Sequence, residues 1–267
     1  MMIADSAMER ASSAILYIVF NLILLVLSSI NVSQAGNDHI EERGAERFHS
    51  GRSFIDDHQL LRRPEEVNCE QSPLSPLDPF YTRDSPNRSN IRDARQGIPL
   101  DFGIQIIHVY NCEPIVNASV NVWHCDSKGI YSGFSMQQIK QCSVGGHCEP
   151  RDSQRFLRGY QFTDEQGWAN FSTIIPGWAP YRTMHINVLV MLSGRDVYAG
   201  EIYFEEKVDE LVASNKPYSI SRILRVSNTK DHHYLKYNGS SNVMNLTGGV
   251  RGLKGSIVLG IEPSLGR

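Results

Sequence analysis

The stretch WANFSTIIPGWAPYRTMHINVLVMLSG, residues 168–194, contains two short apolar runs, 169–174 and 186–192, separated by a Pro-Gly turn. Short runs rich in β-branched and aromatic residues, with turn residues between them, are typical of antiparallel strands. Only residues 205–215 have a helical pattern. The sequence therefore predicts an all-β fold, an antiparallel sandwich or barrel with at most one or two short helices. Further strand-like runs occupy 104–109, 120–124, 161–163 and 253–263.

Length and composition indicate a globular protein. The 267 residues fit one sizeable domain with extensions, and 41% hydrophobic with 21% charged residues is typical of a chain that buries a core. The formal net charge is −3 and the chain has no basic run. The composition therefore lacks the basic surface of a nucleic-acid-binding protein.

The N-terminus carries an apolar run, AILYIVFNLILLVL at 14–27, followed by small residues at 33–35. This length suits the core of a signal peptide and is short for a membrane span. We predict a signal peptide at 1–35, secretion, and no membrane attachment of the mature form; a signal anchor is the alternative. Residues 36–68 are polar with few apolar anchors, so we expect a mobile leader before a folded domain at 69–262 and a tail at 263–267.

Secretion changes the interpretation of the five cysteines. An odd number outside the cell indicates disulfides and one remaining thiol. Cys142 and Cys148 flank the flexible sequence SVGGH, and Cys69 and Cys112 border the region where strands begin. Of the possible pairings we favour Cys142–Cys148 and Cys69–Cys112, which leaves Cys125 as a buried thiol. Three sequons that we place in loops are the expected glycosylation sites: Asn87, Asn238 and Asn245.

Three ordered motifs carry a family resemblance. They are VNVWHCDSKGIYSGF (120–134), FLRGYQFTDEQGWANFSTIIPGW (156–178) and RTMHIN (182–187). Together they closely resemble the intradiol ring-cleavage dioxygenases, particularly the secreted group similar to protocatechuate and catechol dioxygenases, over residues 69–262. The resemblance implies a β-sandwich core and a non-haem Fe(III) held by two tyrosines and two histidines. It also implies O2-dependent cleavage of a catechol-type aromatic substrate.

The resemblance also assigns roles to single residues. Tyr131 matches the first tyrosine ligand and His185 the first histidine ligand. Arg182 matches the cation that stabilises negative charge on the substrate ring, and Gln161 matches a polar residue near the site. Phenolate and imidazole ligands suit ferric iron because this hard cation favours anionic oxygen.

Two of the four implied ligand positions are substituted. Ala179 stands in place of the second tyrosine and Asn187 in place of the second histidine, while Tyr181 replaces a glycine. His185 and Asn187 are two residues apart on a predicted strand, so both point to one face. Asn187 offers iron only a neutral amide oxygen, and Ala179 offers no donor. The sequence therefore predicts that iron binding and catalysis are impaired or absent.

Two alternatives remain open at this level. The chain could be an active catechol dioxygenase with an altered iron site in which Tyr181 is a substitute ligand. It could also be a secreted structural or interaction protein on the same fold. Oligomeric state and the ring substituents of any ligand do not follow from the sequence.

Overall fold

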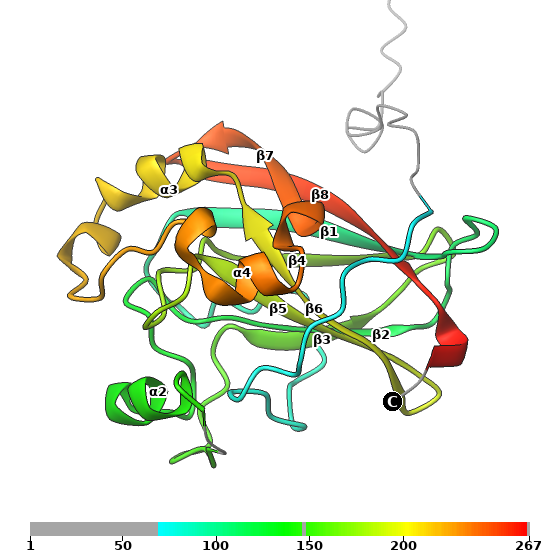
Figure 1. Ribbon diagram of the computed structural model, residues 1–267, viewed down its shortest axis with the longest axis horizontal. Coiled ribbons are helices and arrows are strands. Elements are labelled where there is room, and N and C mark those ends of the chain that lie inside the picture. Colours follow the sequence, from blue (N-terminus) through cyan, green and yellow to red (C-terminus); the bar gives the residue numbers. More distant parts are fainter. Residues whose placement is uncertain (1–68, 146–147, 266–267) are drawn as a thin grey trace, which may run out of the picture. The chain divides into compact units, whose positions relative to one another are not determined.

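The computed structural model describes residues 69–145 and 148–265, which form a β-rich unit (Figure 1). The predicted signal peptide, 1–35, and the predicted leader, 36–68, lie outside the described residues. The strands are β1 (Pro99–His108), β2 (Ser119–Trp123), β3 (Arg158–Phe162), β4 (Trp168–Ile174), β5 (His185–Leu192), β6 (Arg195–Phe204), β7 (Val243–Gly249) and β8 (Gly252–Ile261).

The helices of the described part are short. They are α2 (Met136–Cys142), α3 (Glu206–Ala213) and α4 (His232–Lys236), with 3-10 turns η2 (Tyr218–Ile220), η3 (Asn228–Lys230), η4 (Gly239–Asn242) and η5 (Pro263–Leu265). The prediction of one or two helices was therefore too low. Local caps explain the difference: Ser135 and Gln138 form a capping box before α2, and Asp231 accepts hydrogen bonds from two backbone N–H groups of α4. Within the described residues, none of the helices has the length and apolar character needed to cross a membrane.

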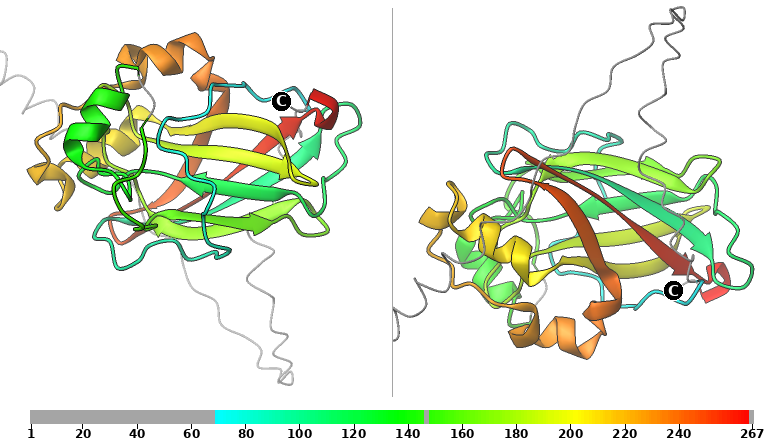
Figure 2. Two further views of the ribbon diagram at one scale, coloured as in Figure 1. Left: turned by 90° about the horizontal axis from the view of Figure 1, so that it is seen from below. Right: turned by 90° about the horizontal axis from the view of Figure 1, so that it is seen from above.

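All eight named strands belong to a single mixed sheet in the order β3-β2-β5-β6-β7-β8-β1-β4. Neighbouring strands are antiparallel except for the parallel pairs β1–β8 and β6–β7. The sheet curls so that β1 and β8 face β2 and β5 across a common core (Figure 2). The predicted antiparallel sandwich is not confirmed, because pairing of β6 with β7 joins the two halves into one nearly closed, barrel-like sheet.

The side chains of β5 alternate between two apolar clusters. Ile186 and Val188 pack into the main core, whereas Leu189 belongs to a second cluster on the opposite face of the sheet. His185 and Asn187 share the face of Leu189, because side chains two apart on a strand point the same way. Both faces of β5 are therefore buried, and the polar groups on the second face need partners there. The other members of the second cluster are Phe80, Trp123, Cys125, Tyr131, Phe134, Ile139, Cys142, Ala179 and Ala199.

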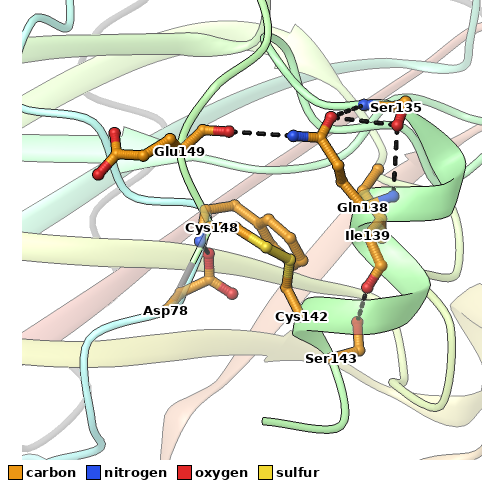
Figure 3. The surroundings of a disulfide bond; sticks show 9 residues. Asp78, Ser135, Gln138, Ile139, Cys142, Ser143, Cys148 and Glu149 are labelled. Carbon is orange, nitrogen blue, oxygen red and sulfur yellow. Dashed lines mark hydrogen bonds between the residues drawn. A yellow bond between two sulfur atoms is a disulfide. The ribbon is translucent and has the colours of Figure 1, made fainter. Parts of the chain in front are cut away.

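The structure contains the two disulfides expected from the sequence, Cys69–Cys112 and Cys142–Cys148. The second bridge closes the segment after α2, where Gln138 also donates a hydrogen bond to the backbone oxygen of Glu149 at 3.0 Å (Figure 3). Cys142 is part of the second cluster, so this bridge holds α2 against the face of the sheet that carries His185 and Asn187.

Cys125 is a buried free thiol, 1% exposed, whose Sγ donates to the backbone oxygen of Gly177 at 3.3 Å. Burial raises the pKa of this thiol, so little reactive thiolate exists in the folded state. We expect iodoacetamide to leave Cys125 unmodified in the native protein and to alkylate it once the chain is unfolded in urea. Non-reducing peptide mapping checks this, and a peptide that links Cys125 to another cysteine would contradict it.

Candidate active site

Tyr131, His185 and Asn187 form a continuous hydrogen-bonded chain on the second face of the sheet. The His185 Nδ1 atom lies 2.7 Å from the backbone oxygen of Thr183, which can only accept, so Nδ1 carries the proton. The His185 Nε2 atom then accepts the hydroxyl proton of Tyr131 at 3.1 Å. Asn187 Nδ2 completes the chain by donating to the Tyr131 oxygen at 3.4 Å and to the backbone oxygen of Trp123 at 3.3 Å. These contacts satisfy the Tyr131 hydroxyl and both ring nitrogens of His185, whereas Asn187 Oδ1 is buried without a hydrogen-bond partner.

The protonation states agree with this chain. Burial, followed by the negative charge of Asp78, raises the pKa of Tyr131 well above its ordinary value. Burial, followed by the positive charge of Arg182, lowers the pKa of His185. Near neutral pH the phenol therefore keeps its proton and the imidazole is uncharged, which is the combination that the Tyr131–His185 hydrogen bond requires.

Position 179, where the resemblance implies the second tyrosine ligand, is buried among closely packed side chains. Ala179 is 1% exposed and lies in the same cluster as Tyr131. The ring of Phe80 stacks on Tyr131 with a centroid distance of 4.4 Å. Asp78 holds Phe80 in place by accepting hydrogen bonds from the Phe80 backbone N–H at 2.9 Å and from Trp123 Nε1 at 3.0 Å. An aromatic side chain of the protein thus covers the face of the one tyrosine that remains at the site.

The Pro-Gly-Trp segment places Ala179 by close backbone packing. A Cβ atom on Gly177 would lie 2.7 Å from the backbone oxygen of Ser127, so only glycine lets this segment approach the loop that leads to Tyr131. Trp178 donates from Nε1 to Asp209 of α3 at 2.6 Å. The motif therefore has a structural role here that does not depend on a ligand at position 179.

The Tyr181 side chain lies at the surface of the described structure. The side chain is 65% exposed, and the φ of 66° at Tyr181 lies in the left-handed region that favours glycine. The expectation that Tyr181 could turn inward as a substitute ligand has no support in this geometry.

Replacing Tyr181 tests that placement. We expect Tyr181→Gly to stabilise the fold by up to about 1 kcal/mol, because glycine relieves the left-handed backbone strain and no buried contact is lost. Urea denaturation measures the change, with Tyr181→Ala as the matched control that keeps the Cβ and should leave the free energy of unfolding nearly unchanged. A clear loss of stability in both variants would show that the ring is packed inside the fold.

Arg182 lies beside this hydrogen-bonded chain of side chains, but its N–H donors already bind carboxylates of the protein. Its Nη2 and Nη1 atoms lie 2.5 and 3.2 Å from the two carboxylate oxygens of Glu201, and its Nε atom lies 2.9 Å from Asp231. Glu201 is 4% exposed and Asp231 is fully buried. Glu201 also stands directly opposite Asn187 in the β5–β6 ladder. Two carboxylates against one guanidinium leave no net positive charge for an anionic substrate ring.

Gln161 is not part of this site. It pairs with Val120 across β2 and β3, and Val120 faces the main core. Residues opposite each other in a ladder share a face, so Gln161 lies on the other face of the sheet from Asn187. Its amide nitrogen donates to Asn87 Oδ1 at 2.9 Å.

Arg158, which belongs to the same R-G-Y-Q motif as Gln161, does reach the site. It is 1% exposed and donates from Nε to Ser132 Oγ at 2.6 Å and from Nη2 to the Ser132 backbone oxygen at 3.0 Å. These bonds fix the backbone next to Tyr131. Sequence reasoning missed Arg158 and Glu201, although Arg158 belongs to the quoted R-G-Y-Q motif.

The described residues do not fit the Fe(III) centre that the resemblance implies. The donors at hand are the protonated Tyr131 hydroxyl, the His185 Nε2 atom and the Asn187 Oδ1 atom, which is buried without a hydrogen-bond partner. Fe(III) bound here would displace the Tyr131 proton, which would give one anionic oxygen, one imidazole nitrogen and one neutral amide oxygen. The resemblance implies two phenolates and two imidazoles, so this donor set has too few anionic and imidazole ligands for a trivalent hard cation. Among residues 69–145 and 148–265, no three His, Cys, Asp or Glu side chains come together as a metal-binding group either.

Comparison with solved structures gives close matches. An intradiol ring-cleavage dioxygenase from Tetranychus urticae is 32% identical, with a TM-score of 0.66, and the match covers 73% of this chain and 96% of that one. A second dioxygenase is 31% identical with a TM-score of 0.65 over the same shares of both chains. The dioxygenase domain of a carbohydrate-binding fusion protein from Streptomyces sp. SirexAA-E, at 24% identity and a TM-score of 0.50 over 71% of this chain and 97% of that domain, shares the fold.

No family model matches the chain. Three observations nonetheless point to the same family. They are the motifs around Tyr131 and His185, the barrel-like mixed sheet, and an identity above 30% over nearly the full length of a solved relative. The chain belongs to the intradiol ring-cleavage dioxygenase family.

Proposed function

We propose that this chain is a secreted intradiol dioxygenase-family protein in which ring cleavage of catechols at a resident non-haem Fe(III) is impaired or absent. The observation that carries the proposal is the donor set beside Tyr131 and His185: position 179 is a buried alanine without a donor, and position 187 offers only a neutral amide. Iron bound between Tyr131 and His185 would gain one phenolate oxygen and one imidazole nitrogen, half of the ligand set that the resemblance implies.

Two further features support the loss of turnover. Tyr131, His185 and Asn187 are each at most 2% exposed, so a catechol would have to open the Phe80 contact before it could reach them. Arg182, the cation expected to stabilise charge on the substrate ring, is neutralised by Glu201 and Asp231. The role that we propose for Arg182 in this chain is to stabilise the folded state.

Secretion, with the signal peptide at 1–35, the leader at 36–68 and the domain at 69–262, is part of the proposal. Two disulfides are compatible with an oxidising compartment. The three expected glycosylation sites are exposed: Asn87, Asn238 and Asn245. Asn245 lies on β7 rather than in a loop as expected, and it is exposed on that strand.

A ring-cleavage assay tests the proposal. The purified chain, incubated with catechol and dioxygen with and without added Fe(III), is expected to form no muconate-type dicarboxylate above the protein-free blank. A solved relative that cleaves catechol serves as the positive control for the assay. Sustained product formation at a rate proportional to protein concentration would overturn the proposal.

A further inference from the structure

A groove of about 960 Å³ lies between the turn at residues 90–97, before β1, and the segment 216–220, after α3. This volume is in the range of small-molecule sites. None of its lining residues belongs to the hydrogen-bonded set of Tyr131, His185 and Asn187, and the groove plays no part in the function proposed above. A smaller cavity of about 350 Å³ shares residues 93–95 with it and extends toward Phe156.

The turn holds two arginines side by side. The Arg95 backbone N–H donates to the Arg92 backbone oxygen at 2.9 Å, and the two residues between them, Asp93 and Ala94, have φ values of 45° and 56°. A two-residue turn with both central residues left-handed normally uses Asn-Gly, so an alanine at the second position is strained. The strain is retained in a segment whose side chains line the groove.

The charges of the groove do not balance. Asp93 is compensated by Arg88, whose Nη2 atom lies 2.8 Å from the Asp93 carboxylate. Arg95 lies 3.4 Å from the centre of the Phe156 ring and 3.6 Å from Asp126, which keeps its guanidinium in place. Arg92 and Lys216 have no ion-pair partner among the described residues. With Asp93 paired to Arg88 and Asp126 paired to Arg95, Arg92 and Lys216 are the two cations of the lining left without a carboxylate. The groove is therefore suited to an anion with two charges.

The opposite wall is apolar and fixed. Ile220 is 58% exposed and lines the groove together with Pro217 and Ala94. Between Pro217 and Ile220, the Tyr218 hydroxyl donates to the Ile175 backbone oxygen at 2.7 Å and accepts from the Ile98 backbone N–H at 3.0 Å. These bonds tie the 216–220 segment to the strand side of the groove, so the site is formed before a ligand arrives.

The geometry points to a binding site for a small aromatic dicarboxylate. Arg92, Arg95 and Lys216 bind the two carboxylates, and the ring lies against Ile220 and Pro217. A planar arginine fork pairs well with a carboxylate, and an apolar wall favours a ring over a compact inorganic anion. Catechol itself, which is neutral near pH 7, does not complement this charge.

Calorimetric titration of the full chain with phthalate tests the site. We expect saturable binding that weakens by about tenfold or more in the double variant Arg92→Gln with Lys216→Gln, since two charge-assisted contacts are lost. Lys140→Gln, which removes an exposed cation from α2, is the matched control and should bind phthalate as the wild type does. Dimethyl phthalate, which has the same ring without the charges, should not bind.

Three results would overturn this assignment. The first is no measurable binding of phthalate to the wild type. The second is equal affinity of the double variant and the Lys140→Gln control, which would place the ligand elsewhere. The third is inorganic phosphate binding as tightly as phthalate, which would leave the apolar wall without a role. Thermal melting of each variant verifies that the comparison is made between folded proteins.

Discussion

The double change Ala179→Tyr with Asn187→His is expected to convert a protein with little iron into one that holds about one Fe(III) per chain, because it returns an anionic oxygen and an imidazole to positions beside Tyr131 and His185. Iron content and a visible phenolate-to-iron absorption band should rise together, and catechol cleavage should follow. Either single change should do much less, since ligands of one metal act as a unit. Metal analysis and absorption spectra of the three variants check this.

Space is the obstacle to this restoration. Ala179 is buried against a cluster in which Phe80 already stacks on Tyr131, so a larger side chain costs about 1–3 kcal/mol in overpacking. Ala179→Phe with Asn187→His is the matched control, because it adds the ring without the phenol oxygen. The same iron content and colour in this control as in the tyrosine variant would contradict the account. Adding Tyr181→Gly gives the loop more freedom to adjust.

Arg182→Met is expected to destabilise the fold by about 3–5 kcal/mol, because it leaves two buried carboxylates without their cation. Burial alone would raise the pKa of Glu201, but the charge of His185, which is protonated only in the acid range, and the charge of Arg182 outweigh burial, and the net pKa lies well below its ordinary value. The pKa of Asp231 is lowered too, where Arg182 and the Thr183 backbone N–H outweigh burial. Urea denaturation of variant and wild type measures the difference.

The pH dependence of the free energy of unfolding distinguishes the loss of the Arg182 charge from the loss of its packing. Carboxylates with depressed pKa stabilise the fold above their unfolded-state pKa of about 4, and this contribution is lost as the pH falls through the folded-state values. Without Arg182 the unpaired carboxylates take up protons more readily, so the gap between variant and wild type should narrow from pH 7 to pH 4. Arg151→Met, which removes an exposed ion pair with Asp152, should change stability by less than about 1 kcal/mol at every pH. A gap that stays constant with pH would contradict the electrostatic origin.

Most strands could be predicted because their apolar runs are local. The run at 186–192 became β5, the helical pattern at 205–215 became α3 (Glu206–Ala213), and the final run became β8. β6 was missed because its sequence, RDVYAGEIYF, mixes charged residues and glycine with apolar ones. It is nevertheless buried along most of its length. The closure of the sheet by β6 and β7 depends on pairing across forty residues, which no local pattern records.

The candidate site also divides into features that follow from a local sequence pattern and features that depend on tertiary pairing. The common face of His185 and Asn187 follows from the two-residue period of a strand and is present in the structure. The position of Glu201 opposite Asn187 depends on the β5–β6 register, and the contact of Arg158 with Ser132 depends on how a loop folds over β2. Gln161 was misplaced because a motif gives spacing along the chain but not the face of an edge strand that a residue occupies.

The iron content and visible spectrum of the unmodified chain, produced in iron-replete medium, test the central claim most directly. Ala179 and Asn187, which stand at two of the four implied ligand positions, predict a colourless protein with far less than one iron per chain. A wine-red protein with stoichiometric iron would contradict it, because the charge-transfer band that gives this colour requires Tyr131 to bind Fe(III) as a phenolate.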